Sequence, residues 1–244
     1  MAATGVVTVE GLIGAGKSSV KEALEVACAA DGLDVVFVDE PVDTWAEFVD
    51  GDGVGILELF YQNQSRWAFS FQMMAYISRL ERLATARREN PGKLIVAERS
   101  LAADHRTFAK MLHDSGDIGD IEFKIYQKWF STFAAKFEPD VVIHLQTPVA
   151  LALERITRRS RGGEETVDAN YLRKLDRYTT EWLENAGSTT VVPLSPTDDA
   201  GREIPARDLA GSMLPTVRDA IESYTSACRS ARLEWPCWHV EVGL

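Results

Sequence analysis

The chain has 244 residues and a formal net charge of −11, from 26 Lys and Arg against 37 Asp and Glu. This acidic balance argues against a surface that binds nucleic acid or an anionic membrane, because such surfaces gather Lys and Arg. A hydrophobic fraction of 45% with 26% charged residues is ordinary for a globular protein.

The three cysteines, Cys28, Cys228 and Cys237, are too few and too irregularly spaced for a zinc site or a disulfide framework, so we expect reduced thiols. The first five residues, MAATG, lead almost directly into an apolar segment and leave no room for a targeting peptide. No apolar run is long enough to span a membrane. We therefore expect an intracellular, cytoplasmic protein.

Five short apolar runs alternate with long segments of helical periodicity, which is typical of an α/β fold with a parallel sheet and crossover helices. The runs are rich in β-branched residues, as expected of strands that are buried on both faces. The expected strands are 6–10, 34–38, 93–97, 141–145 and 190–193. The expected helices are 17–30, 56–62, 65–91, 102–114, 118–136, 148–160, 168–186 and 206–226.

No repeat, low-complexity tract or linker divides the chain, so we expect residues 1–244 to form a single domain. Segments 51–55 and 195–205 are expected to be loops. The aromatic C-terminal tail, from about 228 to 244, suggests no role.

A phosphate-binding loop follows the first expected strand. The stretch GLIGAGKS, residues 11–18, fits G-x-x-x-x-G-K-[ST] at every fixed position and lies between a strand and a helix. Backbone N–H groups and the helix N-terminus would cradle phosphate oxygens, while Lys17 reaches the outer phosphates and Ser18 meets Mg²⁺. The expected phosphate-binding residues are Gly11, Gly14, Ala15, Gly16, Lys17, Ser18 and Ser19.

Two adjacent acids, Asp39 and Glu40, directly follow the second strand in the stretch VDEPVDTW. Such a pair can belong to a solvated loop, cap a helix or supply a catalytic base. The choice depends on what the rest of the chain brings to the same end of the sheet.

The long helix 65–91 carries a candidate for base recognition. Gln72 and Arg79 are seven residues apart and share one face, and a glutamine amide offers a donor and an acceptor side by side. On the next helix Asp104 and Phe108 are four apart and also share a face. A phenyl ring there can stack on a base while Asp104 pairs with Arg79.

Glu98 and Arg99 follow the third strand. The carboxylate can hold Mg²⁺ directly or through water, and the guanidinium can stabilise negative charge on an acceptor. The alternative is a local ion pair at a helix start, with Ser100 as the N-cap.

An arginine cluster ends the helix 148–160 and is followed by Gly162 and Gly163. It can be a solvated basic helix end, which the helix dipole favours. In an acidic chain that carries a phosphate loop, it instead indicates a lid that closes over the transferring phosphoryl group. The cluster consists of Arg155, Arg158, Arg159 and Arg161.

Six stretches of the chain resemble the motifs of one known enzyme family. In chain order they are EGLIGAGKSS, DEPVDTW, YQNQSRWAFSFQ, ERSLAADHRTF, RITRRSRGGEE and NYLRKL. With these motifs the chain resembles the deoxyribonucleoside kinases, the family of deoxycytidine, deoxyguanosine and mitochondrial thymidine kinases and the insect broad-specificity enzyme. The resemblance spans roughly residues 6 to 185 and fades beyond about 195. It implies a P-loop kinase fold, a nucleoside 5′-kinase activity with ATP and Mg²⁺, and a homodimer.

The resemblance also implies roles for individual residues. Glu40 is the expected general base for the 5′-hydroxyl, assisted by Arg99, while Glu98 and Ser18 organise Mg²⁺. Gln72 is expected to hydrogen-bond the base. Phe108 is expected to stack on it and Trp45 to wall the pocket, with Tyr61 and one of Glu164 or Glu165 on the 3′-hydroxyl. Arg155, Arg159 and Arg161 are the expected lid, at about 155–167.

This chain departs from the family in the lid, where Gly162-Gly163 adds a residue before the acid pair. Counting back from Tyr171 selects Glu164 for the sugar, whereas aligning the acid pair selects Glu165, and we prefer Glu164. Arg79 and Asp104 stand where deoxycytidine and deoxyguanosine kinases have an Arg–Asp pair. We therefore expect deoxyadenosine, deoxycytidine or deoxyguanosine to be preferred over thymidine.

Two other functions share the phosphate loop. A nucleoside monophosphate kinase of the thymidylate type binds an acceptor that already carries a charged phosphate, which Glu40 and Glu98 would repel. A non-catalytic nucleotide-binding regulatory protein would need neither a base nor a lid. The sequence favours a small-molecule kinase over both.

Overall fold

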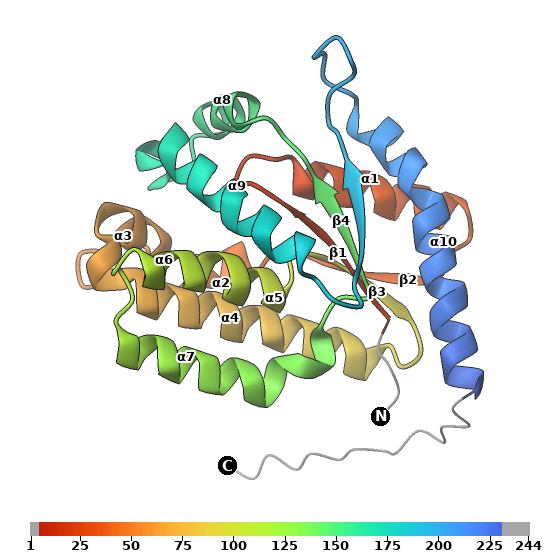
Figure 1. The fold of residues 1–244 in the computed structure, drawn as a ribbon, viewed down its shortest axis with the longest axis horizontal. Helices are drawn as coiled ribbons and strands as arrows, with labels where there is room; N and C mark the ends of the chain where they lie inside the picture. The colour runs from red at the N-terminus through yellow and green to blue at the C-terminus, as the bar shows by residue number, and fades with distance from the viewer. Residues whose placement is uncertain (1–4, 231–244) are drawn as a thin grey trace.

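The computed structural model describes residues 5–230, which form one central sheet with helices on both faces (Figure 1). All five strands are parallel and lie in the order β2-β3-β1-β4-β5. The strands are β1 (Val6–Gly11), β2 (Val35–Val38), β3 (Leu94–Glu98), β4 (Val141–Leu145) and β5 (Thr190–Leu194). Every residue of β1, β3 and β4 is buried, which explains their β-branched composition. The predicted α/β fold is confirmed, and each strand agrees with its predicted range to within one residue at either end.

The helices form two layers around the sheet (Figure 1). On one face α1 (Lys17–Ala30) and α10 (Ala206–Ser230) pack against each other and against β1 and β3. On the other face α4 (Gln64–Glu89) covers Ile95 and Ala97 of β3, and α9 (Ala169–Glu184) covers Val142 of β4. The other helices are α2 (Val42–Ala46), α3 (Ile56–Gln62), α6 (Lys110–Asp114), α7 (Asp120–Phe133), η2 (Ala134–Phe137), α8 (Val149–Arg159) and η3 (Glu164–Thr166).

The predicted helix 102–114 is continuous in the chain but not regular. It begins as α5 (Leu101–Ala103), passes through a π-helix, η1 (Asp104–Ala109), and ends as α6. Helices α2 and η3 fall in segments that were not predicted to be helical, and α10 runs four residues beyond its predicted end. The predicted loops 51–55 and 195–205 are turns, each closed by a single antiparallel bridge, Val49 to Gly55 and Thr197 to Glu203.

The strand order places β1 in the centre, with β3 on one side and β4 on the other. In open parallel sheets ligands bind beyond the carboxyl ends of the strands, where the order reverses. The segments that follow β1, β2 and β3 therefore converge on one region. Within residues 5–230 no helix has the length and apolar character needed to cross a membrane. Cys237 and the aromatic part of the C-terminal tail lie outside the described residues.

Candidate active site

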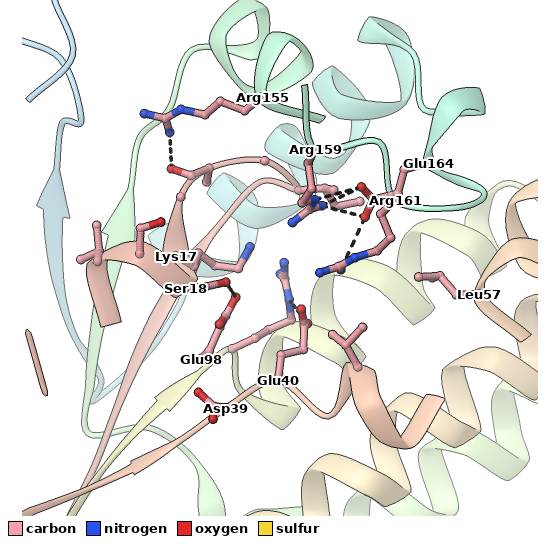
Figure 2. Close-up of a pocket in the computed structure, with 18 of the residues that line it drawn as sticks. Lys17, Ser18, Asp39, Glu40, Leu57, Glu98, Arg155, Arg159, Arg161 and Glu164 are labelled. Carbon is pink, nitrogen blue, oxygen red and sulfur yellow. Dashed lines mark hydrogen bonds and ion pairs between the residues drawn. The ribbon is translucent and has the colours of Figure 1, made fainter. Parts of the chain in front are cut away.

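A cavity of about 1020 Å³ lies beyond the carboxyl ends of the strands, lined by residues of the phosphate loop, α2 to α4, η1, the lid and the start of α10. It contains nearly all the residues that the sequence predicted for the site. The exceptions are Gly11, which lies just behind it and accepts a hydrogen bond from Arg99, and Glu165, which is exposed outside it. Figure 2 shows the labelled side chains around this cavity, with Lys17 and Glu40 facing the lid residues Arg159, Arg161 and Glu164.

The phosphate loop connects β1 to α1 and packs closely against the backbone of α8. Gly14 has φ +77°, and a Cβ there would lie 2.3 Å from the carbonyl oxygen of Ala152, so only glycine fits. Lys17 Nζ donates to the carbonyl of Leu12 at 2.9 Å, which folds the side chain over its own loop. Burial and the nearby charge of Arg99 lower the pKa of Lys17 to about 8.

Glu40 lies between two arginines. Its Oε1 accepts hydrogen bonds from Arg79 at 3.2 Å and from Arg99 at 3.3 Å. Burial alone would raise the pKa of Glu40, but the charges of Arg99, Arg79 and Lys17 outweigh it and lower the pKa to about 2. The carboxylate is therefore ionised at neutral pH and can only accept hydrogen bonds.

Asp39, the neighbour of Glu40, has a different environment. It pairs with Lys21 of α1 at 2.6 Å, and its side chain is 68% exposed. Asp39 contributes to the rim of the cavity. Among the described residues, it makes no hydrogen bond or ion pair with Arg79 or Arg99, which instead contact Glu40. Of the two adjacent acids, Glu40 alone is thus built into the buried charge network.

The predicted pair of Arg79 and Asp104 forms in the structure. Arg79 Nε donates to Asp104 Oδ2 at 2.8 Å, and both side chains are almost fully buried. A third contact joins Arg79 to the carbonyl of Glu98 at 3.0 Å. Although burial opposes it, the charges of Asp104 and Glu40 raise the pKa of Arg79, so the arginine stays charged. Arg79 therefore links the helix α4 to the segment after β2, to the end of β3 and to η1.

Ser18 and Glu98, the two expected Mg²⁺ ligands, contact each other, since Ser18 Oγ donates to Glu98 Oε1 at 3.0 Å. Hydroxyl and carboxylate oxygens are suitable ligands for Mg²⁺, which usually keeps several waters and is shared with substrate phosphates. No cluster of three or more His, Cys, Asp or Glu side chains in residues 5–230 offers a cage for a metal ion. The residues present therefore fit a Mg²⁺ ion carried in with a nucleotide.

The part of the cavity next to α4 has aromatic walls and one buried amide. Gln72 is 2% exposed, and its Oε1 has no hydrogen-bond partner among the described residues. Trp45 donates to Ser78 Oγ at 2.9 Å and packs edge-on against Phe71. Phe108 also lines the cavity, with the Arg99 guanidinium 4.6 Å from its ring centre. A buried amide with an unpaired oxygen, in a cavity lined by aromatic rings, fits a site for a nucleobase.

The lid arginines are not all alike. Arg159 and Arg161 bind Glu164 at 2.7 and 3.6 Å, and Glu164 is buried at the edge of the cavity. Arg155 instead donates to the carbonyl of Ala15 in the phosphate loop and to Glu203, both at 2.8 Å. Tyr61 lies near Glu164 within the cavity, and burial raises its pKa well above the usual value.

Two features of the site were not predicted. Glu10, the residue before the phosphate loop, is buried among the charged groups, and burial raises its pKa against the opposing charge of Arg99. In the sequence, only its position at the end of a strand indicated that Glu10 could lie near the site. The second feature is the segment from Pro196 to Leu209, which contributes part of the cavity wall although the sequence indicated only a loop and the start of a helix there. Residue type alone gives no signal for that contribution.

Comparison with known proteins identifies the family of this chain. The deoxynucleoside kinase family, represented by a sequence profile, matches residues 7–203. A probable deoxycytidine kinase of fowlpox virus is 33% identical over 219 residues, covering 88% of this chain and 87% of the viral protein. Deoxycytidine kinase 2 of Gallus gallus is 31% identical over 197 residues, covering 72% of this chain and 73% of its own. A mitochondrial deoxyguanosine kinase of Xenopus laevis is 29% identical over 136 residues, which cover 52% of this chain and 51% of the frog protein.

The matched region contains the sheet except for Val6, the first residue of β1, together with the phosphate loop and the lid. The predicted family and kinase activity are confirmed, and neither a monophosphate kinase nor a non-catalytic protein is favoured. The protein uses a nucleotide phosphate donor and acts on small-molecule nucleosides. The chain therefore belongs to the deoxynucleoside kinase family.

Proposed function

We propose that this protein transfers the γ-phosphoryl group of ATP to the 5′-hydroxyl of a deoxyribonucleoside. The observation that carries the proposal is the Glu40 carboxylate, which is held between Arg79 and Arg99 in the same cavity as the phosphate loop. A carboxylate there suits a neutral hydroxyl acceptor. An acceptor that already carries a 5′-phosphate would be repelled by Glu40 and by Glu98 nearby.

In the proposed reaction the 5′-oxygen forms a bond to the γ-phosphorus as the bond to the β–γ bridging oxygen breaks. The hydroxyl proton passes to Glu40. Lys17 and the lid arginines Arg159 and Arg161 neutralise charge on the transferring group, and Arg99 keeps Glu40 in place. The catalytic residues are thus Glu40, Arg99 and Lys17.

Mg²⁺ would be held by Ser18 and Glu98, whose oxygens are already 3.0 Å apart. When bound, the ion supplies positive charge next to the β- and γ-phosphates. The donor's phosphates would lie on the loop of Gly11, Gly14, Ala15, Gly16 and Ser19, with Arg155 above Ala15.

The nucleoside would occupy the aromatic part of the cavity. Gln72 would hydrogen-bond the base edge, with Phe108 stacked on the ring and Trp45 closing the pocket. Tyr61 and Glu164 would hold the 3′-hydroxyl. Glu164 is preferred over Glu165 because only Glu164 is buried at the cavity, whereas Glu165 is exposed.

For the base, we propose that deoxyadenosine, deoxycytidine or deoxyguanosine is preferred over thymidine. The buried pair of Arg79 and Asp104 lines the same cavity as Gln72. An ion pair there favours an exocyclic amino group and crowds the methyl group of thymine. The relatives named as deoxycytidine and deoxyguanosine kinases support the same preference.

A panel of the four natural deoxynucleosides and dCMP, assayed with Mg·ATP, tests these proposals. We expect phosphorylation of the amino-bearing nucleosides with higher kcat/KM than thymidine, and little or none of dCMP. Equal or better kcat/KM for thymidine would contradict the base preference alone. Efficient phosphorylation of dCMP with no turnover of any nucleoside would contradict the proposed acceptor.

We also propose that residues 1–244 form one kinase domain, with a lid at about 155–167, and that two copies associate as a homodimer. Helix α7 supports the dimer by exposing large apolar side chains at every fourth position, Ile121, Ile125, Trp129 and Phe133. Such a stripe is unusual on the surface of a monomer.

A further inference from the structure

Glu10 is a buried carboxylate to which the proposed reaction gives no role. It is the last residue but one of the central strand β1, directly before the phosphate loop, and is 1% exposed. Its Oε1 accepts a hydrogen bond from the backbone N–H of Ser100 at 2.7 Å. Its Oε2 is buried without a hydrogen-bond partner among the described residues and lies 3.9 Å from Arg99 Nη1. Burying a carboxylate costs free energy, so the presence of Glu10 in the interior requires a physical reason.

Arg99, which faces Glu10, has a strained backbone. Its φ of +66° lies in the left-handed region, which side chains other than glycine rarely adopt. Such a conformation persists only where the surroundings fix it, and it is typical of functional sites. This turn directs the guanidinium towards Glu40, to which Arg99 Nε donates at 3.3 Å.

The end of β1 fixes this turn through three consecutive residues. The carbonyl of Val9 accepts from Arg99 N at 3.1 Å, and the carbonyl of Gly11 accepts from Arg99 Nη2 at 3.3 Å. Between these two backbone contacts, Glu10 contributes its side chain to Ser100 N and faces the same guanidinium. Both the backbone and the side chain of Arg99 are thus attached to the strand that carries the phosphate loop.

We infer that Glu10 is a positioning residue, which holds Arg99 in its left-handed turn and balances its charge while Glu40 takes up the proton. This inference rests on the proposed kinase reaction at Glu40. When Glu40 is protonated, Arg99 loses a negative partner at 3.3 Å. Glu10, which does not contact the cavity, keeps a carboxylate oxygen directed at Arg99 throughout the transfer.

The experiment is a double-mutant cycle with Glu10→Gln and Arg99→Lys, in which kcat and KM are measured for the best deoxynucleoside of the panel and for ATP. Glutamine keeps an oxygen for Ser100 N but removes the charge. We expect Glu10→Gln to lower kcat about tenfold with both KM values unchanged, and to cost less than about twofold when Arg99→Lys is already present. The stoichiometry of nucleotide binding, measured by calorimetry, gives the folded fraction of each variant, and each kcat is divided by that fraction.

The matched control is Glu138→Gln, which removes a carboxylate from another arginine pair, with Arg106 at 2.8 Å, away from the cavity. We expect its kcat to equal that of the wild type.

The inference is overturned if Glu10→Gln keeps the wild-type kcat, or if its loss of kcat is the same in the wild type and in the Arg99→Lys background. If Glu10→Gln does not fold, Glu10→Asp replaces it. Aspartate keeps the charge but shortens the reach to Ser100 N, so a reduced kcat supports the inference and a wild-type kcat overturns it. Failure of the wild type to phosphorylate any nucleoside would instead reject the proposed function.

Discussion

At the scale of single residues, the two acids after β2 show what a sequence can and cannot specify. Two carboxylates at a strand end indicate a site, and the family resemblance selects Glu40. The two acids have different roles because their side chains point in different directions. Asp39 pairs with Lys21 of α1, whereas Glu40 pairs with Arg79 and Arg99. Glu10 was not predicted because a glutamate at a strand end gives no indication of the partners that lie 90 residues away.

Glu40→Gln is expected to lower kcat by about 10²- to 10⁴-fold, because glutamine cannot accept the hydroxyl proton. The affinity for ATP should change little, since Glu40 does not lie on the phosphate loop. Asp39→Asn is the matched control, because it removes the adjacent carboxylate, which lies outside the buried network. Steady-state kinetics with binding of ATP measured by calorimetry checks both variants. A Glu40→Gln enzyme that keeps most of its kcat would reject the base assignment.

The nucleotide affinity is expected to depend on pH through Lys17. Burial and Arg99 lower the pKa of Lys17 to about 8 in the free protein. Binding of phosphate requires the charged form, so nucleotide binding should weaken by about tenfold as the pH rises from about 7 to about 9. Lys17→Arg keeps a charge that does not titrate in this range and should remove this dependence. Equal slopes for the wild type and Lys17→Arg would show that another group titrates.

At the scale of elements, the regular helices and strands followed from periodicity, whereas the irregular ones did not. Helix α2 has only five residues, so it shows no repeat of the helical period. The π-helix η1 requires hydrogen bonds one residue longer than those of an α-helix, and its sequence DHRTFA gives no signal for this change. It nevertheless places both Asp104 and Phe108 in the cavity, as their spacing predicted.

The lid depends on one glycine. Gly163 has φ +84°, and a Cβ there would lie 2.7 Å from Cα of Glu58, so the lid packs directly on α3. Gly163→Ala should displace the following Glu164. We therefore expect kcat/KM for a deoxynucleoside to fall about tenfold, and less for its 2′,3′-dideoxy analogue, because only the former has the hydroxyl that Glu164 would bind.

Gly162→Ala is the matched control for this change. A Cβ at Gly162 would meet only the Glu58 carboxylate, at an ordinary distance of 3.6 Å. The ratio of kcat/KM for the deoxy and dideoxy nucleosides separates the two variants. An unchanged ratio in Gly163→Ala would show that Glu164 does not bind the 3′-hydroxyl, or that the lid tolerates the methyl group.

At the scale of the whole molecule, the sheet explains why distant motifs form one site. The phosphate loop, Glu40 and Glu98 all lie at the carboxyl ends of strands of a parallel sheet, so the topology alone brings them to one edge. The sequence could predict this convergence from the alternation of strands and helices. It could not predict that the segment after β5 returns to the cavity, since nothing in its composition relates it to the phosphate loop.

The proposed dimer also belongs to this scale. Helix α7 packs on the outer side of α4 (Figure 1), and Ile121, Ile125, Trp129 and Phe133 on it are 68%, 43%, 45% and 38% exposed. A charge of −11 on each copy opposes association, so a dimer requires an apolar contact of this kind. We expect Trp129→Glu to convert a dimer of twice 27.0 kDa into a monomer, as measured by light scattering after size-exclusion chromatography.

Val26→Glu provides the comparison for the dimer, because Val26 is 71% exposed on α1, which covers the other face of the sheet. It places the same charge on an exposed apolar position and should leave the mass unchanged. Among the described residues, none of α7 lines the cavity, so the monomer should keep its nucleotide affinity. A wild type that is monomeric at micromolar concentration, or a Trp129→Glu protein that remains dimeric, would show that α7 does not form the interface.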